Sequence, residues 1–196
     1  MKILCFGDSN TYGYDPCSYF GGRRPTEQRW VDLLARQLGC TVVNAGENGR
    51  EIPSRAGELR RFDRLLTEQA PVDLLLIMLG TNDLLQGNSP EAVTQRMERF
   101  LEHLQLERSK ILLIAPPPMK LGAWVPTQSL VDSAAELSRT YQVLSERLGI
   151  ACVCAGDWDL SLEFDGVHLT AQGQMAFARK LLECNIISQE GLYVQG

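Results

Sequence analysis

The stretch VDLLLIMLGTND, residues 72–83, joins an apolar run that only Asp73 interrupts to a short polar segment. A near-continuous apolar run of this length is typical of a strand buried on both faces of a parallel sheet. We therefore predict a buried strand over residues 72–78. Four more runs have the same character, at residues 2–6, 41–43, 111–115 and 150–154.

Helical patterns lie between and after these strands. Apolar residues recur at helical spacing in five segments, at residues 28–38, 54–66, 89–106, 127–148 and 170–184. Strands that alternate with helices indicate a parallel sheet covered on both faces. Right-handed crossovers then give a doubly wound arrangement. The sequence thus predicts an α/β fold, a three-layer α/β/α sandwich with a five-stranded parallel sheet.

Composition favours a cytoplasmic protein that acts on small molecules. The net charge of −5 argues against a nucleic-acid partner, because a phosphate backbone requires clustered Lys and Arg. No apolar run approaches the ~20 residues of a membrane span, and no signal peptide precedes the first strand. We expect all six cysteines to be reduced thiols and no membrane partner. Assembly into a homo-oligomer is left open.

The chain divides into one domain and a short tail. A length of 196 residues with 44% hydrophobic content suffices for one sizeable core, which we assign to residues 1–187. Residues 188–196 form the tail. Its last seven residues, EGLYVQG, resemble the remnant of a tag-removal protease site and are left out of the fold prediction.

Chemically active residues follow the strands on the edge of the sheet where ligands bind. In an open parallel sheet the ligand crevice lies beyond the carboxyl ends of the strands. Ser9, Gly49 and Asn82 follow the first three strands in chain order. Asp165 and His168 come a short loop after the fifth strand. These are the parts of a hydrolytic site.

Asp165 and His168 have the spacing of an oriented catalytic base. On a turn, a carboxylate three residues before a histidine can accept from Nδ1–H and leave Nε2 free to take a proton. The alternative is a turn next to a surface histidine. The chain has one other histidine, His103, in a polar helical segment. If a histidine is the base, it is His168, and Ser9 is its candidate nucleophile rather than only a helix cap.

Three hydrogen-bond donors could stabilise an oxyanion at the same edge. They are the Ser9 N–H, the Gly49 N–H and the side-chain amide of Asn82. Taken singly, Gly49 and Asn82 are equally typical of turns.

Together the motifs resemble a known family. Ser9 stands in a Gly-Asp-Ser block, Gly49 in Asn-x-Gly-x-x-Gly and Asn82 in Gly-x-Asn-Asp, and an Asp-x-x-His block follows. Over nearly the whole chain this order resembles the SGNH hydrolases, also called the GDSL esterase family. Residues 3–9 and 77–83 and the prolines at 116–118 look most similar to the bacterial arylesterase and acyltransferase branch.

The resemblance implies a role for each residue. Ser9 would be the nucleophile, His168 the base and Asp165 its orienting partner. The oxyanion hole would comprise Ser9, Gly49 and Asn82. The fold would be the flavodoxin-like SGNH hydrolase type, and neither a metal ion nor a cofactor is expected. The substrate would be a small-molecule ester with a short acyl group, hydrolysed or transferred through an acyl-enzyme.

The sequence departs from the family name at one position. Asn10 follows the nucleophile where the name implies leucine, and we expect it to alter the substrate pocket. The rest of that pocket is predicted to be apolar, formed by Tyr12, Leu84, Trp124 and Val125.

Other functions stay open. A carbohydrate O-acetylesterase, a lysophospholipase or a thioesterase would use the same residues. A non-catalytic nucleotide- or flavin-binding module would have the same sheet, although the glycine spacing does not match Gly-x-Gly-x-x-Gly. A carbohydrate-binding or scaffold protein on a decayed hydrolase fold is the third alternative, against which the intact Ser9, Asp165 and His168 argue.

Overall fold

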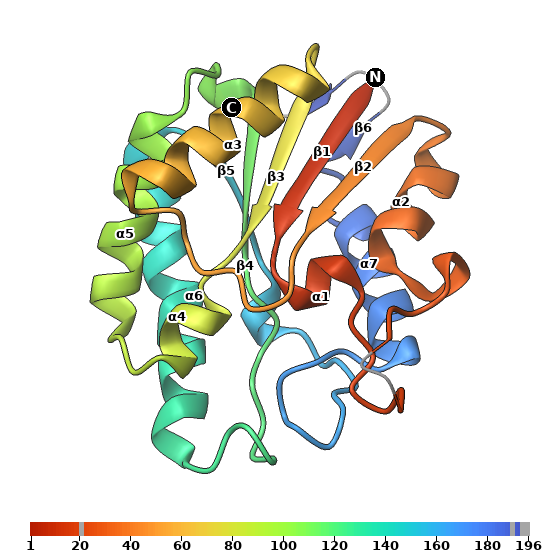
Figure 1. The fold of residues 1–196 in the computed structure, drawn as a ribbon, viewed down its shortest axis with the longest axis vertical. Coiled ribbons are helices and arrows are strands. Elements are labelled where there is room, and N and C mark those ends of the chain that lie inside the picture. The colour runs from red at the N-terminus through yellow and green to blue at the C-terminus, as the bar shows by residue number, and fades with distance from the viewer. Residues whose placement is uncertain (20–21, 189–190, 193–196) are drawn as a thin grey trace.

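One parallel sheet organises the chain (Figure 1). The computed structural model describes residues 1–19, 22–188 and 191–192. The strand order is β2-β1-β3-β4-β5, which confirms the predicted five-stranded parallel sheet. The strands are β1 (Lys2–Gly7), β2 (Thr41–Gly46), β3 (Leu74–Met78), β4 (Ile111–Ala115) and β5 (Ala151–Cys154).

Helices follow the strands, largely as the periodicity predicts. The two shortest, α1 and α4, were not predicted, and α5 ends at His103 rather than near residue 106. The α-helices are α1 (Ser9–Tyr12), α2 (Trp30–Leu38), α3 (Ala56–Gln69), α4 (Thr81–Leu85), α5 (Pro90–His103), α6 (Gln128–Leu148) and α7 (Ala171–Glu183). Short 3₁₀ helices occur at Thr26–Gln28 (η1), Arg108–Lys110 (η2) and Ala155–Asp157 (η3).

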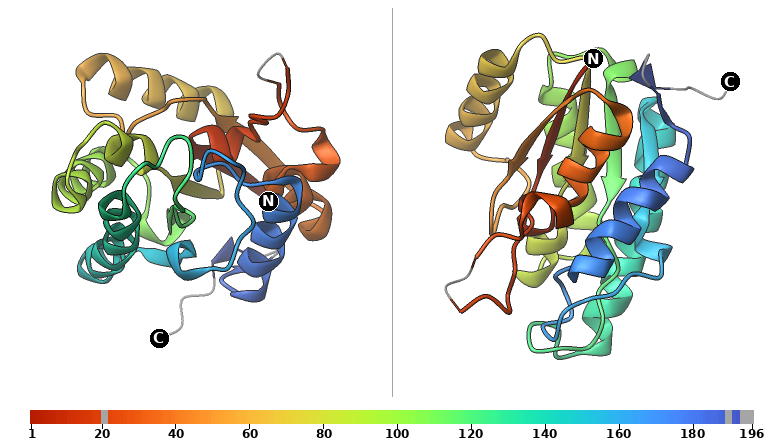
Figure 2. Two further views of the ribbon diagram at one scale, coloured as in Figure 1. Left: turned by 90° about the horizontal axis from the view of Figure 1, so that it is seen from below. Right: turned by 90° about the vertical axis from the view of Figure 1, so that its right-hand side faces the viewer.

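Helices cover both faces of the sheet (Figure 2), and the sheet separates two hydrophobic cores. Successive side chains of a strand point to opposite faces. Leu4 and Phe6 of β1 accordingly pack with the core under α3, α5 and α6. Ile3 and Cys5 pack with the core under α2 and α7. The three-layer α/β/α sandwich is therefore confirmed.

The C-terminal segment adds a two-stranded sheet, in which β6 (Ile187–Ser188) pairs antiparallel with β7 (Gly191–Leu192). Most of the predicted tag remnant, at residues 190 and 193–196, lies outside the described residues. The six cysteines are free thiols. Within the described part of the chain, no helix has both the length and the apolar character that crossing a membrane requires.

Candidate active site

The candidate nucleophile lies where β1 ends. Gly7 of β1 pairs with Gly46 of β2, so the two strands end at the same level. Ser9 follows two residues later and begins α1. The side chain of Asp8 caps this short helix by accepting from the Asn10 N–H at 2.9 Å.

Close packing fixes α1 against the end of β2. A Cβ at Gly46 would lie 2.1 Å from the backbone nitrogen of Tyr12, so only glycine fits there. The Asn44 side chain also donates to the Thr11 carbonyl at 2.8 Å. The position of Ser9 is therefore set directly by the sheet.

Ser9, His168 and Asp165 form a continuous hydrogen-bonded row. Ser9 Oγ lies 2.9 Å from His168 Nε2, and Nδ1 of the same ring lies 2.7 Å from Asp165 Oδ2. All three side chains are buried. When Nδ1–H donates to Asp165, the Nε2 lone pair faces the Ser9 hydroxyl. This is the arrangement of a nucleophile, a base and an orienting acid.

The turn that carries His168 is built around Asp165. Asp165 Oδ1 accepts from the N–H groups of Val167 and His168, both at 2.9 Å. Gly166 has a φ of +81°, and a Cβ there would lie 2.0 Å from the Lys120 carbonyl oxygen. Burial alone would raise the pKa of Asp165, but the hydrogen bonds from His168 and Val167 outweigh it and hold the pKa below its ordinary value. The carboxylate therefore stays ionised and fixes the ring in one tautomer.

Asn82 and Gly49 lie on the loops that follow β3 and β2. The Asn82 amide donates to the Arg50 carbonyl at 3.0 Å. Gly49 directly precedes Arg50 and has a φ of +74°. The Arg50 guanidinium donates to the Gly7 carbonyl at 2.8 Å, which ties the loop to the end of β1. The predicted oxyanion donors thus share the sheet edge that carries Ser9.

Two aromatic rings lie against the catalytic imidazole. The ring centroids of Tyr14 and Trp124 are 4.8 Å and 5.0 Å from that of His168. Trp124 was expected near the site, whereas Tyr14 was not identified from the sequence. Leu121 and Phe164 are 61% and 64% exposed on two loops that are hydrogen-bonded to each other. We refer to these two residues and Trp124, which is 49% exposed, as the apolar rim; of the three, the Trp124 ring contacts His168.

The other predicted pocket residues require correction. Leu84 and Val125 are 2% and 0% exposed and belong to the core, so neither lines an open pocket. The Tyr12 ring is covered by the Arg23 guanidinium, 4.4 Å from its centroid. Asn10 is also buried, and its side chain binds the backbone of the histidine loop rather than facing an open pocket.

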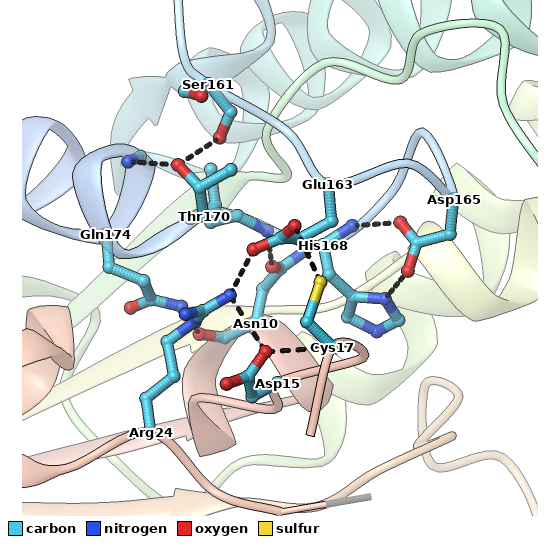
Figure 3. A network of polar contacts seen from close by, with 12 residues as sticks. Asn10, Asp15, Cys17, Arg24, Ser161, Glu163, Asp165, His168, Thr170 and Gln174 are labelled. Carbon is cyan, nitrogen blue, oxygen red and sulfur yellow. Dashed lines mark hydrogen bonds and ion pairs between the residues drawn. The ribbon is translucent and has the colours of Figure 1, made fainter. Parts of the chain in front are cut away.

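Within residues 1–19, 22–188 and 191–192, one cluster of three side chains has the spacing of metal ligands. It consists of Asp15, Cys17 and Glu163 (Figure 3). The Arg24 guanidinium pairs with Glu163 and lies 3.4 Å from Asp15 Oδ1. This cation already balances the two carboxylates, so the group fits an ion-paired anchor better than a metal site. That the reaction needs no metal stays a prediction.

A cavity of about 630 Å³ lies beside the catalytic edge. It extends from the loop after β2 to α3, and Gly49, Arg50 and Phe62 are among the residues that line it. Ser9 and His168 are not among its described lining residues. The hydrogen-bonded row of Ser9, His168 and Asp165 therefore lies outside the described lining of this cavity.

Relatives of the chain share its fold and are named as esterases. An arylesterase of Vibrio mimicus is 30% identical over 124 residues, which is 60% of this chain and 56% of that protein. A structure from Agrobacterium tumefaciens, assigned provisionally as an arylesterase, is 31% identical with a TM-score of 0.80, covering 94% of this chain and 97% of that one. A carbohydrate acetylesterase family member from Sinorhizobium meliloti is 26% identical with a TM-score of 0.81, covering 96% and 98%.

The fold and the triad define a serine hydrolase on a three-layer α/β/α sandwich. Residues 5–176 match the profile of the GDSL-like Lipase/Acylhydrolase family, and the chain belongs to that family. The resemblance drawn from the motifs is thereby confirmed. The matched region spans little more than half the length of the Vibrio mimicus arylesterase, 56%.

Proposed function

We propose that the chain is a serine esterase that hydrolyses small carboxylic esters with short acyl groups through an acyl-enzyme. One observation carries this proposal: the His168 ring lies within hydrogen-bonding distance of both Ser9 Oγ and Asp165, at 2.9 Å and 2.7 Å. A serine hydroxyl becomes an effective nucleophile only when a base takes its proton, and this arrangement supplies that base.

The mechanism follows from the positions of the groups. His168 Nε2 accepts the Ser9 proton as the serine oxygen attacks the ester carbonyl. The Ser9 N–H, the Gly49 N–H and the Asn82 amide stabilise the resulting oxyanion. His168 then donates the proton to the departing alcohol, which leaves the acyl group on Ser9. A water molecule, deprotonated by His168, attacks the acyl carbonyl, and His168 returns that proton to Ser9 Oγ as the bond between Oγ and the acyl group breaks and the carboxylic acid leaves.

The apolar rim supports an apolar or aromatic alcohol as the leaving group. Trp124, Leu121 and Phe164 are each about half or more exposed, and the Trp124 ring lies against His168. Burying such side chains against a ligand contributes about 25 cal/mol per Å² of apolar area. Acyl transfer to a second alcohol would follow the same path, with that alcohol in place of the water.

Removal of acetyl groups from carbohydrates is the second candidate. Its support is the likeness to the carbohydrate acetylesterase family member of Sinorhizobium meliloti. An exposed Trp124 ring next to the triad would also suit a sugar, because the faces of sugar rings pack on aromatic rings.

We further propose a reducing, cytoplasmic setting. The six free cysteines support it, because thiols persist in that compartment. A small-molecule ester, rather than a nucleic acid or a membrane, remains the proposed partner. Assembly into a homo-oligomer is left open as before.

A panel of substrates tests the proposal. The rates on p-nitrophenyl esters of increasing acyl length, on phenyl acetate and on an acetylated sugar would be compared. We expect the highest kcat/KM for acetate and other short acyl esters with an aromatic leaving group. A clear preference for the acetylated sugar would favour the second candidate, and no hydrolysis of any ester would contradict both.

A further inference from the structure

Asn10 connects the nucleophile turn to the loop of the catalytic histidine (Figure 3). It directly follows Ser9 in α1, and only 2% of it is exposed. Its Nδ2 donates to the Val167 carbonyl at 3.1 Å, and its Oδ1 accepts from the Leu169 N–H at 2.9 Å. The two groups it binds belong to the residues on either side of His168.

This pair of hydrogen bonds restrains the position of the imidazole. The backbone that carries His168 cannot move away from Ser9 unless one of the two bonds breaks, and the ring on that backbone is oriented by Asp165. Each broken bond would leave a buried backbone group unpaired, at a cost of about 1–3 kcal/mol. The side chain of Asn10 therefore acts on His168 through the backbone.

Asn10 is itself held rigidly by a buried network. Its backbone carbonyl accepts from Trp30 Nε1 at 3.1 Å and from Gln174 Nε2 at 3.0 Å. Gln174 Oε1 in turn accepts from the Trp30 backbone N–H at 2.9 Å. The amide that restrains the histidine loop is thus fixed to α2 and α7 as well as to the turn of Ser9.

Contacts that do not involve Asn10 join the two ends of the histidine loop. The Glu163 N–H donates to the His168 carbonyl at 2.8 Å, and Glu163 is paired with Arg24. The Thr170 N–H donates to the Ser161 carbonyl at 3.0 Å. Because these contacts do not involve Asn10, the loop should still fold without the Asn10 amide, but with the imidazole less accurately placed.

We propose that Asn10 is a positioning residue, which sets the distance between Ser9 Oγ and His168 Nε2 by binding the backbone at Val167 and Leu169. This inference rests on the proposed esterase function. Leucine, which the family name implies at this position, has no hydrogen-bonding group and cannot make either contact. The departure from the family name therefore acts on the placement of the base, and the earlier expectation that it alters the substrate pocket is replaced.

The test compares two buried amides of one network. Asn10→Leu removes the contacts to both neighbours of His168, whereas the control Gln174→Leu removes contacts only to Trp30 and Asn10. For Asn10→Leu we expect kcat on p-nitrophenyl acetate to fall roughly 10- to 100-fold with KM within about twofold, because displacement of about 1 Å can cost 10²-fold. For Gln174→Leu, in which Trp30 Nε1 still donates to the Asn10 backbone carbonyl, we expect a lower Tm and a kcat within about threefold of the parent.

A kcat of folded Asn10→Leu within about threefold of the parent would overturn the proposal, and so would equal losses of kcat in the two variants. If Asn10→Leu does not fold, Asn10→Asp is used with Gln174→Glu as its control. Asn10→Asp keeps the acceptor for the Leu169 N–H but loses the donor to Val167, so we expect the same loss of kcat with little change in KM.

A spectroscopic measurement separates this inference from the proposed function. The NMR signal of the His168 Nδ1 proton, shared with Asp165, reports the placement of the ring without any substrate. We expect this signal to shift or disappear in Asn10→Leu and to be retained in Gln174→Leu. An unchanged signal in both variants would overturn the role of Asn10. If the parent protein shows the Nδ1 proton signal but hydrolyses no ester, only the proposed function is contradicted.

Discussion

The nucleophile and the base of this site are held in place by different means. Ser9 lies two residues after β1, whose neighbours in the sheet are β2 and β3. His168 lies in a long loop between η3 and α7. The one pair of residues in this loop that the structure gives as a β-bridge, Leu162 with Leu169, is isolated from the sheet. Strand pairing therefore places the serine, whereas side chains bound to backbone place the histidine.

Because Ser9 and His168 are held by different means, residues that support them should differ in whether they affect stability or catalysis. Loss of a residue that supports β1 should affect the whole sheet, because the central strands are buried on both faces. Loss of a residue that supports the histidine loop should affect mainly the distance between His168 and Ser9. Substitutions that weaken the support of β1 should therefore lower mainly Tm, whereas those that weaken the support of the histidine loop should lower mainly kcat.

The largest effect is expected at the serine itself. Ser9→Ala removes the hydroxyl that lies 2.9 Å from His168 Nε2 and leaves the backbone of α1 unchanged. Loss of a triad member costs on the order of 10⁴-fold or more in turnover, so hydrolysis should nearly vanish while Tm stays close to that of the parent. A variant that keeps more than a few per cent of parental kcat/KM would show that the nucleophile is misassigned.

Asn82 is a second residue that a strand of the sheet places, since it follows β3. Asn82→Ala should lower kcat by roughly 10²–10³-fold with little change in KM, because the amide binds the oxyanion more strongly than the neutral carbonyl. Asn82→Asp should be at least as slow, since it places a negative charge beside a forming one. If Asn82→Asp instead retains near-parental kcat at similar Tm, Asn82 is only a turn residue.

The variant Gly166→Ala tests how the loop that carries His168 places the base. The new Cβ would lie 2.0 Å from the Lys120 carbonyl oxygen at a φ of +81°, so the turn must shift. We expect kcat/KM to fall by roughly 10²-fold and the free energy of unfolding to fall by about 1–3 kcal/mol.

Gly149→Ala is the matched control for that variant. Gly149 also has a positive φ, +63°, but no atom lies within 4 Å of an added Cβ. Alanine there should cost stability of about 1 kcal/mol and leave kcat unchanged. Equal losses of kcat in the two variants would contradict the claim that the turn at Gly166 places the base.

The smallest effect concerns Asp8, the cap between β1 and Ser9. Burial raises its pKa from 3.8 to about 6, although the Asn10 N–H and nearby positive groups oppose the shift. Between those pH values the folded chain holds a proton that the unfolded chain releases, so the free energy of unfolding falls as pH rises through that window.

Asp8→Asn keeps an acceptor for the Asn10 N–H and removes the titration. Relative to the parent, its stability should increase from about pH 4 to about pH 6 by on the order of 1–3 kcal/mol and then level off. Thermal melts of both proteins between pH 4 and pH 8 measure this. A difference in Tm that is constant over the whole range would contradict the raised pKa.

Much of the fold could be predicted because most of its strands are near-continuous apolar runs. The run at residues 111–115 has the bounds of β4, and the other predicted strands overlap the observed ones. Helices α1 and α4 were missed because four or five residues are too few to show a helical period. Their positions depend on contacts at the sheet edge, such as those of Gly46, rather than on their own sequence.

The site could be predicted only where chain order and spacing carry the information. Asp165 and His168 are three residues apart, and Ser9 and Asn82 come shortly after the ends of β1 and β3. Leu84 and Val125 were misplaced because an apolar loop residue next to a site can equally point into the core. Tyr14 and the role of Asn10 depend on contacts with a loop more than 150 residues away, and no local pattern reports such contacts.

Labelling with a fluorophosphonate probe tests the central claim most directly, because the probe reacts with a serine only when a base activates it. Peptide mapping of the folded protein should find one adduct per chain, on Ser9, and His168→Gln should abolish the reaction while retaining the fold. An adduct on a different residue, no adduct on folded protein, or labelling of His168→Gln at the parental rate would contradict the account.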